Sequence, residues 1–149
     1  MATYSFIDVY ATLNDSATGA SIQIGSDAGV AEEGIVVVAV DNVGALQIGA
    51  DATPMQVLHA TRGARLTVNI LKTSPVNAQL MALLEAQRVS GALWGQNNIS
   101  ITNIATGDNV ECADVAFEKI PDNAYDKTGK MFAWTFLIGD ATQILGGGV

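Results

Sequence analysis

Residues 64–88 read ARLTVNILKTSPVNAQLMALLEAQR, a stretch in which an alternating pattern gives way to a helical one. In its first part Leu66, Val68 and Ile70 alternate with polar residues, which is the period of a strand with one buried face. This part therefore predicts a strand over residues 64–72.

The second part of the same stretch predicts the one helix of the chain, over about residues 75–90. Ser74 is a suitable N-cap, and Pro75 fits the first helical position, where its missing N–H costs nothing. An apolar stripe recurs at helical spacing and is expected to pack the helix against a sheet. Its leucines are Leu80, Leu83 and Leu84.

Short alternating or apolar runs, separated by turn residues, extend over the rest of the chain and predict a mainly β protein. The expected strands are residues 3–13, 20–25, 34–40, 46–49, 55–61, 98–105, 110–118 and 131–138. In the first of these the alternation places Ile7 on the same face as Val9. Residues 26–34 are expected to form a loop and residues 41–44 a hairpin turn. With no repeat or linker, residues 1–149 are interpreted as a single domain with a flexible, glycine-rich end at about 146–149.

The charge pattern argues for assembly and against general binding of nucleic acids. Fifteen acidic and seven basic residues give a net charge of −8, and only 15% of the residues are charged, where about 25% is usual. The runs 34–40 and 131–138 are apolar on both faces, so both faces need to be covered. We therefore expect part of the surface to be buried against other subunits.

Residues that could support catalysis or metal binding are few. The chain has one cysteine, Cys112, and one histidine, His59, which excludes a disulfide framework and a His-pair metal site. We interpret both as structural. No phosphate-loop motif occurs, and the adjacent pair Glu32-Glu33 would point to opposite faces of an extended chain. We expect no enzyme activity, no cofactor and no metal.

Two further absences concern location. The N-terminus lacks the basic and apolar regions of a signal peptide, and no apolar run approaches the 18 or so residues that span a membrane. We therefore expect synthesis in a cytoplasm and no membrane insertion.

Four stretches stand out in order along the chain. TYSFIDVY stands at 3–10, a loop ends in GVAEEG at 29–34, LKTSPVNAQL at 71–80 runs into the helix, and GQNNISIT stands at 95–102 before a last aromatic strand. Together they resemble the tail tube proteins of contractile-tailed bacteriophages. The run LKTSPVNAQL is the most specific part of the resemblance, which extends over nearly the whole chain.

The resemblance implies an antiparallel β-barrel or β-sandwich with one flanking helix, a fold shared with type VI secretion tubes. Six subunits would close into a ring, and rings would stack into a tube beneath a contractile sheath in the virion tail. The implied partners are further copies of the chain, the sheath, the tape-measure protein, and the baseplate and tail-terminator proteins. DNA would pass through the lumen without specific binding.

The same resemblance suggests roles for individual residues. The polar faces of strands 64–72 and 98–105, with two further acids, are the expected lining of the lumen: Asp8, Thr67, Asn69, Ser100, Thr102 and Asp114. Stacking between rings is assigned to the 26–34 loop and the 41–63 region. The residues expected at contacts between rings or between subunits are Glu32, Glu33, Val36, Val38, Asp51 and Met55.

Three other interpretations stay open at this point. A type VI secretion-like tube subunit would have the same fold. A β-sandwich module that binds carbohydrate or mediates adhesion would need an exposed aromatic platform, which cannot be picked out from the sequence. A hydrolase would depend on His59 alone.

Overall fold

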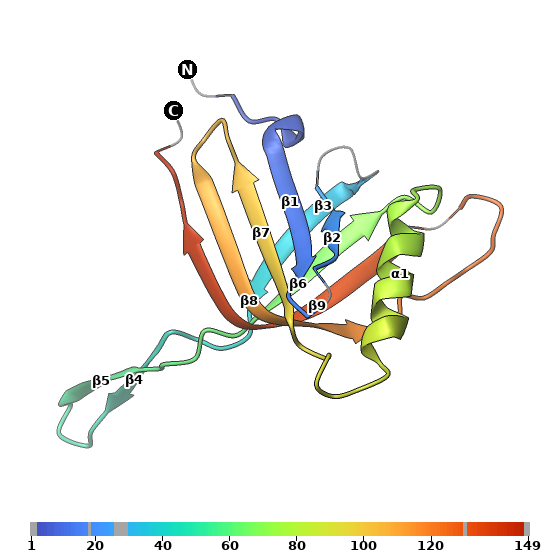
Figure 1. Ribbon diagram of the computed structural model, residues 1–149. Coiled ribbons are helices and arrows are strands. Elements are labelled where there is room, and N and C mark those ends of the chain that lie inside the picture. The colour runs from blue at the N-terminus through green and yellow to red at the C-terminus, as the bar shows by residue number, and fades with distance from the viewer. Residues whose placement is uncertain (1–2, 18, 26–29, 130, 148–149) are drawn as a thin grey trace.

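The computed structural model describes residues 3–17, 19–25, 30–129 and 131–147, without the side chains of residues 30–33. Within these ranges the chain forms a short 3₁₀-helix, nine strands and one α-helix (Figure 1). Their bounds are η1 Phe6–Asp8, β1 Val9–Asp15, β2 Ser21–Gln23, β3 Val30–Ala39, β4 Gly44–Ile48, β5 Pro54–Leu58, β6 Ala64–Ile70, α1 Val76–Gln87, β7 Asn97–Asn103, β8 Asp108–Lys119 and β9 Phe132–Ile144.

Seven of the strands form one antiparallel sheet in the order β2-β1-β7-β8-β9-β6-β3. Strands β4 and β5 pair only with each other in the described structure, and the hairpin they form projects away from the sheet (Figure 1). The expected mainly β, antiparallel fold with one flanking helix is confirmed.

The large sheet turns a corner within its two longest strands, at Asp114 of β8 and Gly139 of β9. Asp114 has φ +55°, and the register of β8 with β7 shifts by one residue beside it. A Cβ on Gly139 would lie only 3.0 Å from the Asp114 Cβ, so the two strands approach closely here. Bulges of this kind let a strand pass from one packed sheet to the other, and Figure 1 shows β8 and β9 bending sharply.

The corner divides the sheet into two halves. The β1 half contains β2, β1, β7, β8 as far as Ala113 and β9 from Asp140 onward. The β6 half contains β3, β6, β9 as far as Ile138 and β8 from Val115 onward.

The core lies between the two halves, with α1 packed into it. Buried side chains come from the β1 half, from the β6 half and from the stripe on α1. They include Leu13, Ile99, Leu66, Phe117, Trp134, Phe136, Leu80, Leu83 and Leu84. The rings of Phe117 and Phe136 lie 5.0 Å apart, so the aromatic residues of β8 and β9 pack together in its centre.

Hydrogen bonds fix the helix in this position. The Trp134 Nε1–H donates to Asn77 Oδ1 at 3.0 Å. At the other end of α1, the buried amides of Gln87 and Asn97 donate to each other at 2.7 and 3.1 Å. Buried amides are costly unless they are paired, so this reciprocal pair holds α1 against the start of β7.

The boundaries of several elements differ from those expected. Residues 6–8 form η1 rather than the start of a strand because the Ser5 hydroxyl accepts from the Ile7 N–H, and Ile7 is consequently 73% exposed. The helix ends at Gln87 rather than near residue 90. Residues 30–34 belong to β3 rather than to a loop. Residues 41–44 are not a hairpin turn, because β4 pairs with β5 and not with β3.

The described part of the C-terminal segment is held in place by contacts with the β7–β8 turn. The Gly146 N–H donates to Asp108 Oδ1 at 2.7 Å, and a Cβ at Gly146 would overlap the Thr106 carbonyl oxygen. Gly146 therefore packs on the β7–β8 turn, which differs from the flexible end expected from residue 146. Residues 148 and 149 lie outside the described residues.

Candidate assembly interface

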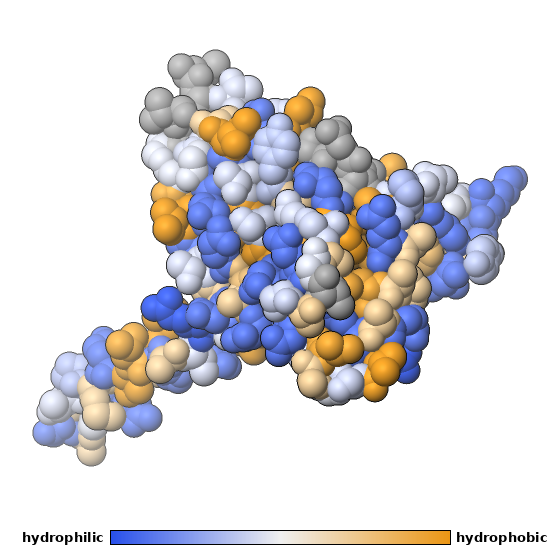
Figure 2. All heavy atoms as spheres, viewed as in Figure 1, coloured by the Kyte–Doolittle hydropathy of each residue, from blue (hydrophilic) through white to orange (hydrophobic). Residues whose placement is uncertain are grey.

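The hairpin that carries β4 and β5, here called the arm (residues 40–63), has no hydrophobic core of its own. Of its residues only Val57 and Gly63 are partly buried. Leu58 is 83% exposed and Ile48 65% exposed. Figure 2 shows apolar side chains at the surface along the projecting arm. An isolated two-stranded hairpin is marginal in water, so the arm is a surface that needs a partner.

The register of the arm gathers three large apolar side chains, those of Leu46, Ile48 and Leu58, on one face. Gly44 pairs with Leu58, Leu46 with Gln56 and Ile48 with Pro54. Partners and alternate residues share a face, so the face contains Leu46, Ile48, Pro54 and Leu58. Of the candidates named from the sequence, Met55 lies in β5 on the opposite face and is 55% exposed.

Asp51 lies in the turn at the tip of the arm. Its Oδ1 accepts from the Thr53 N–H at 3.2 Å, and hydrogen bonds from Thr53 lower the pKa of the carboxyl group. It is the one acidic or basic residue between positions 42 and 61, apart from His59. The tip is therefore anionic at neutral pH, and the other charged side chains of the arm, Asp41 and Arg62, lie at its base.

Strand β3 forms one edge of the seven-stranded sheet. It pairs with β6 on one side and with no strand of the described structure on the other. Val36 and Val38 point away from the core and are 46% and 56% exposed. A long apolar edge strand is a template for pairing with another chain. Glu32 and Glu33 have their backbone in β3, but their side chains lie outside the described residues.

The structure does not bring the residues expected at a lumen onto one surface. Thr67 and Asn69 lie on the outer face of the β6 half, opposite the core. Ser100 and Thr102 lie on the outer face of the β1 half, across the corner. Ser100 Oγ donates to a Glu111 carboxylate oxygen at 3.0 Å. The alternation of residues within a strand does not reveal a corner in the sheet. The sequence therefore could not show that Thr67 and Asn69 lie on a different half from Ser100 and Thr102.

The two acids named with them occupy different places again. Asp8 lies in η1, where its carbonyl oxygen accepts from the Ile104 N–H at 3.2 Å. Asp114 is the bulged residue at the corner and is exposed. Neither belongs to the polar face of a regular strand.

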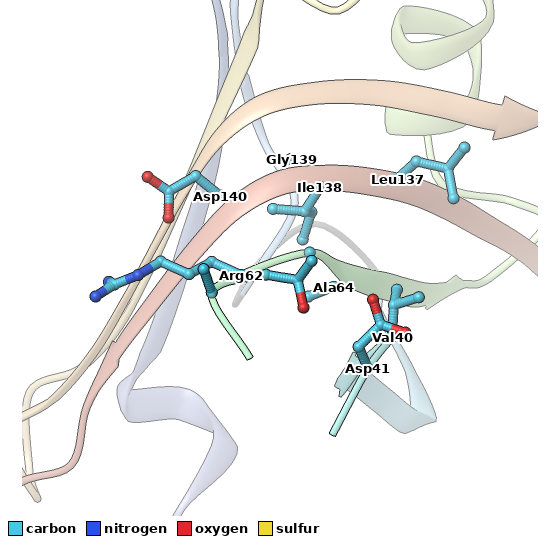
Figure 3. A pocket seen from close by; sticks show the side chains of 11 residues that line it. Val40, Asp41, Arg62, Ala64, Leu137, Ile138, Gly139 and Asp140 are labelled. Carbon is cyan, nitrogen blue, oxygen red and sulfur yellow. The ribbon is translucent and has the colours of Figure 1, made fainter. Parts of the chain in front are cut away.

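A groove of about 610 Å³ lies at the base of the arm, between the arm and β9 (Figure 3). Its labelled lining includes Leu137 and Ile138 on the apolar side, with Asp41, Arg62 and Asp140 as the charged groups. Arg62 and Asp140 lie on one side of it and Asp41 on the other (Figure 3). The groove could not be recognised from the sequence, because its walls are 70 or more residues apart along the chain.

Chemical sites are not apparent in the described residues. No three His, Cys, Asp or Glu side chains there are grouped to hold a metal ion. Cys112 is buried, and burial, with the neighbouring Glu111 carboxylate, raises the pKa of its thiol to about 11. His59 follows β5 on the exposed base of the arm rather than lying within a strand. Among the described helices, none has the length and apolar character required to span a membrane.

Comparison with known proteins identifies the family. Residues 1–146 match the family model of the bacteriophage PhiTE tail tube protein. This chain belongs to that family of phage tail tube proteins. It is therefore a structural subunit of a tail tube and a component of the virion, and not an enzyme.

The fold of this tail tube protein is also found in contractile injection systems. It is similar to a chain in the extended sheath-tube complex of the extracellular contractile injection system PVC, with a TM-score of 0.64 and 9% identity, covering 96% of this chain and 92% of the other. A chain in the PVC sheath/tube terminator structure matches with a TM-score of 0.61 and 10% identity, covering 99% of both chains.

A third structure, the Hcp1 protein of E. coli EAEC 042, matches at 16% identity over 92% of this chain and 97% of the other. Its TM-score is 0.41. No curated protein matches the chain in sequence.

Proposed function

We propose that copies of this tail tube protein, as a single domain, close into rings of six, and that the rings stack through the arm into a tube whose lumen carries DNA to the host. The observation that carries the proposal is the long, unpaired β3 edge together with the unsupported apolar arm. Each is a surface that one chain exposes and that a stable assembly would cover.

Two free edges of the β6 half support the proposed ring closure. One is β3, and the other is β8 beyond Val115, which pairs only with β9 in the described structure. β6 is antiparallel to β3 and to β9, and β9 is antiparallel to β8, so β3 and β8 run in opposite directions. A β8 edge from the next copy would therefore continue the antiparallel pattern, and head-to-tail repetition would close a ring.

A barrel built in this way would enclose a channel. Each copy contributes four strands from its β6 half: β8, β9, β6 and β3. Barrels of about 16–18 strands already leave an open aqueous lumen, and six copies exceed that number. The face turned to the lumen would be the outer face of the β6 half, with Thr67 and Asn69, since the other face is covered by the core and α1.

If the outer face of the β6 half lines the lumen, fewer of the residues predicted from the sequence can face it. Ser100 and Thr102 would lie away from the lumen, on the β1 half, as would Glu111 beside them. Asp114 would mark the boundary between the two halves.

Stacking is assigned to the arm. It leaves the β6 half between β3 and β6, so it extends from the strands proposed to form the barrel. We propose that its apolar face, with Leu46, Ile48 and Leu58, packs against a copy in the next ring. Asp51 at its tip and Met55 near it would take part in the contact between rings. Val36 and Val38 would instead lie where β3 meets the next copy within a ring, on the face turned to the lumen.

The same arrangement suggests which other proteins would contact the tube. The helix α1 lies on the side of the β6 half away from the proposed lumen, so it would face outward, toward a sheath. The PVC structures that share this fold are a sheath-tube complex and a sheath/tube terminator, which supports a sheath and a terminator as partners here. A tape-measure protein inside the tube, a baseplate below it and assembly in the host cytoplasm complete the proposal.

Negative-stain electron microscopy of the concentrated protein, with its mass measured in solution, tests the proposal. Hollow rings or tubes with six-fold end views are the expected result. A monodisperse monomer at every concentration, also after addition of purified baseplate, would contradict it. A ring with another number of copies would correct the symmetry and leave the lumen assignment in place.

A further inference from the structure

An ion pair crosses the outer face of the β6 half. The Arg65 Nε lies 3.0 Å from Glu118 Oε2. Arg65 is on β6 and Glu118 on β8, with β9 between them, and Arg65 is opposite Leu137 in the register of β6 and β9. The guanidinium therefore reaches across a strand to meet the carboxylate.

Among the described side chains, this pair holds most of the charge on the face that we propose for the lumen. In the described structure the other residues of that face are uncharged, except Lys119 at the end of β8. The uncharged residues are Val36, Val38, Thr67, Asn69, Ala116, Ala133, Thr135 and Leu137. Among the described side chains of this face Arg65 is the only arginine, and Glu118 pairs with it.

The ion pair between Arg65 and Glu118 contributes little to the stability of the fold. The side chains of Arg65 and Glu118 are 53% and 28% exposed, and exposed pairs contribute little because water screens them. A free guanidinium, in contrast, is a strong ligand for phosphate, which it binds with two parallel hydrogen bonds.

We propose that Glu118 masks Arg65, so that the sugar-phosphate backbone of DNA passes this surface without being held. The inference rests on the proposed function, because only there does DNA meet this face. Each copy repeats the same arginine around a ring and along the tube. Unmasked, these cations would bind one DNA molecule at many points, and multivalent contacts multiply weak affinities.

Substitution Glu118→Gln tests the masking directly. It keeps the shape of the side chain and removes its charge. The probe is a short, fluorescent DNA duplex, titrated at low salt against the purified subunit and against assembled tubes. We expect Glu118→Gln to bind it about tenfold more tightly than the unmodified protein, with a steeper loss of affinity as salt rises.

Two variants are the controls. Glu111→Gln makes the same charge change on the β1 half, beside Ser100 and away from Arg65, and should bind the duplex as weakly as the unmodified protein. The double variant Arg65→Gln/Glu118→Gln retains Lys119 and should lose the gain in affinity for the duplex. Unchanged melting temperatures would show that all variants fold.

The outcomes separate the inference from the proposed function. If Glu118→Gln binds no better than Glu111→Gln, or the double variant binds as well as Glu118→Gln, the masking is wrong. If the subunit gains affinity but tubes seen by microscopy do not, masking is supported and the lumen assignment of this face is overturned. If no tubes form, the proposed function fails, while the subunit titration still decides the role of Glu118.

Discussion

Asp114 shows how one residue shapes the whole sheet. It has a left-handed conformation, φ +55°, which aspartate tolerates better than most residues but which is strained for a β-branched side chain. Across the strand pair, Gly139 leaves room where a Cβ would meet the Asp114 side chain. The corner therefore depends on a local backbone state and not on the charge of Asp114.

We predict that Asp114→Val lowers the free energy of unfolding by about 1–2 kcal/mol, because valine is strained at positive φ. Asp114→Gly removes the same charge but accepts this conformation, and should leave stability within about 0.5 kcal/mol of the unmodified protein. Chemical denaturation of both variants measures the difference. Equal losses in the two variants would show that the charge, and not the conformation, matters at the corner.

Cys112 should behave as an inert core residue. Burial, and secondarily Glu111, raises the pKa of its thiol from 9.0 to about 11, and only the thiolate reacts quickly. At about pH 8 we expect negligible alkylation of the native protein and rapid alkylation of the protein unfolded in guanidinium. Fast native labelling would mean that β8 opens locally.

The same thiol predicts a direction for stability against pH. The unfolded chain loses the thiol proton near pH 9.0 and the native protein only near pH 11. The contribution of Cys112 to stability is therefore complete below about pH 9 and lost as the pH rises through about 11. Comparing unfolding of the unmodified protein and Cys112→Val across this window isolates the effect, which should be absent in the variant.

At the scale of the element, α1 separates into a buried and an exposed side. Leu80, Leu83 and Leu84 are at most 7% exposed, whereas Ala78 and Ala82 face outward. The helix is held by its leucines and by the Gln87–Asn97 pair, so its packing, and not its intrinsic propensity, determines its stability.

We predict that Leu83→Asp costs more than about 4 kcal/mol, since it removes a buried leucine and places a charge in the core. That loss is comparable to the whole stability of a small domain, so insoluble or unfolded protein is expected. Ala82→Asp, one residue earlier on the exposed side, should fold and lose less than about 1 kcal/mol. Circular dichroism and solubility measure both, and a folded Leu83→Asp would contradict the packing of α1.

At the scale of the whole molecule, the arm is separable from the domain that carries it. The His59 N–H donates to the Val43 carbonyl oxygen at 2.8 Å, so these two residues are adjacent at the base of β4 and β5. Removal of residues 44–58 leaves chain ends that a two-residue Asn-Gly turn can close. No residue of the arm between these ends belongs to the buried core.

We predict that this arm-deleted variant melts within about 4 °C of the unmodified protein, since it loses little buried surface. It should form rings through β3 and β8 but no stacked tubes. Electron microscopy distinguishes rings from tubes, and tubes of normal length would exclude the arm from stacking. Loss of the rings as well would mean that the arm also joins neighbours within a ring.

Much of this fold could be predicted from local patterns. The alternation at Leu66, Val68 and Ile70 identified a strand with its buried face, and the spacing of Leu80, Leu83 and Leu84 identified the buried side of the helix. Boundaries were less accurate: Ser5 caps a 3₁₀ turn, and Ile7 consequently leaves the face predicted for it. The pairing of β4 with β5 was missed because adjacent strands separated by turn residues are equally suited to several pairings.

The sequence by itself determined the class of the protein, because charge content, strand period, one capped helix and the LKTSPVNAQL run at 71–80 are all local properties of the chain. Only the tertiary structure decided which surfaces belong together. The corner at Asp114 places Thr67 and Ser100 on different halves. Within the described part of the chain, the pairings leave one edge of β3 and the whole arm without a partner. Which surfaces lie together depends on contacts between residues far apart in the sequence, and the alternation of residues within one strand does not reveal these contacts.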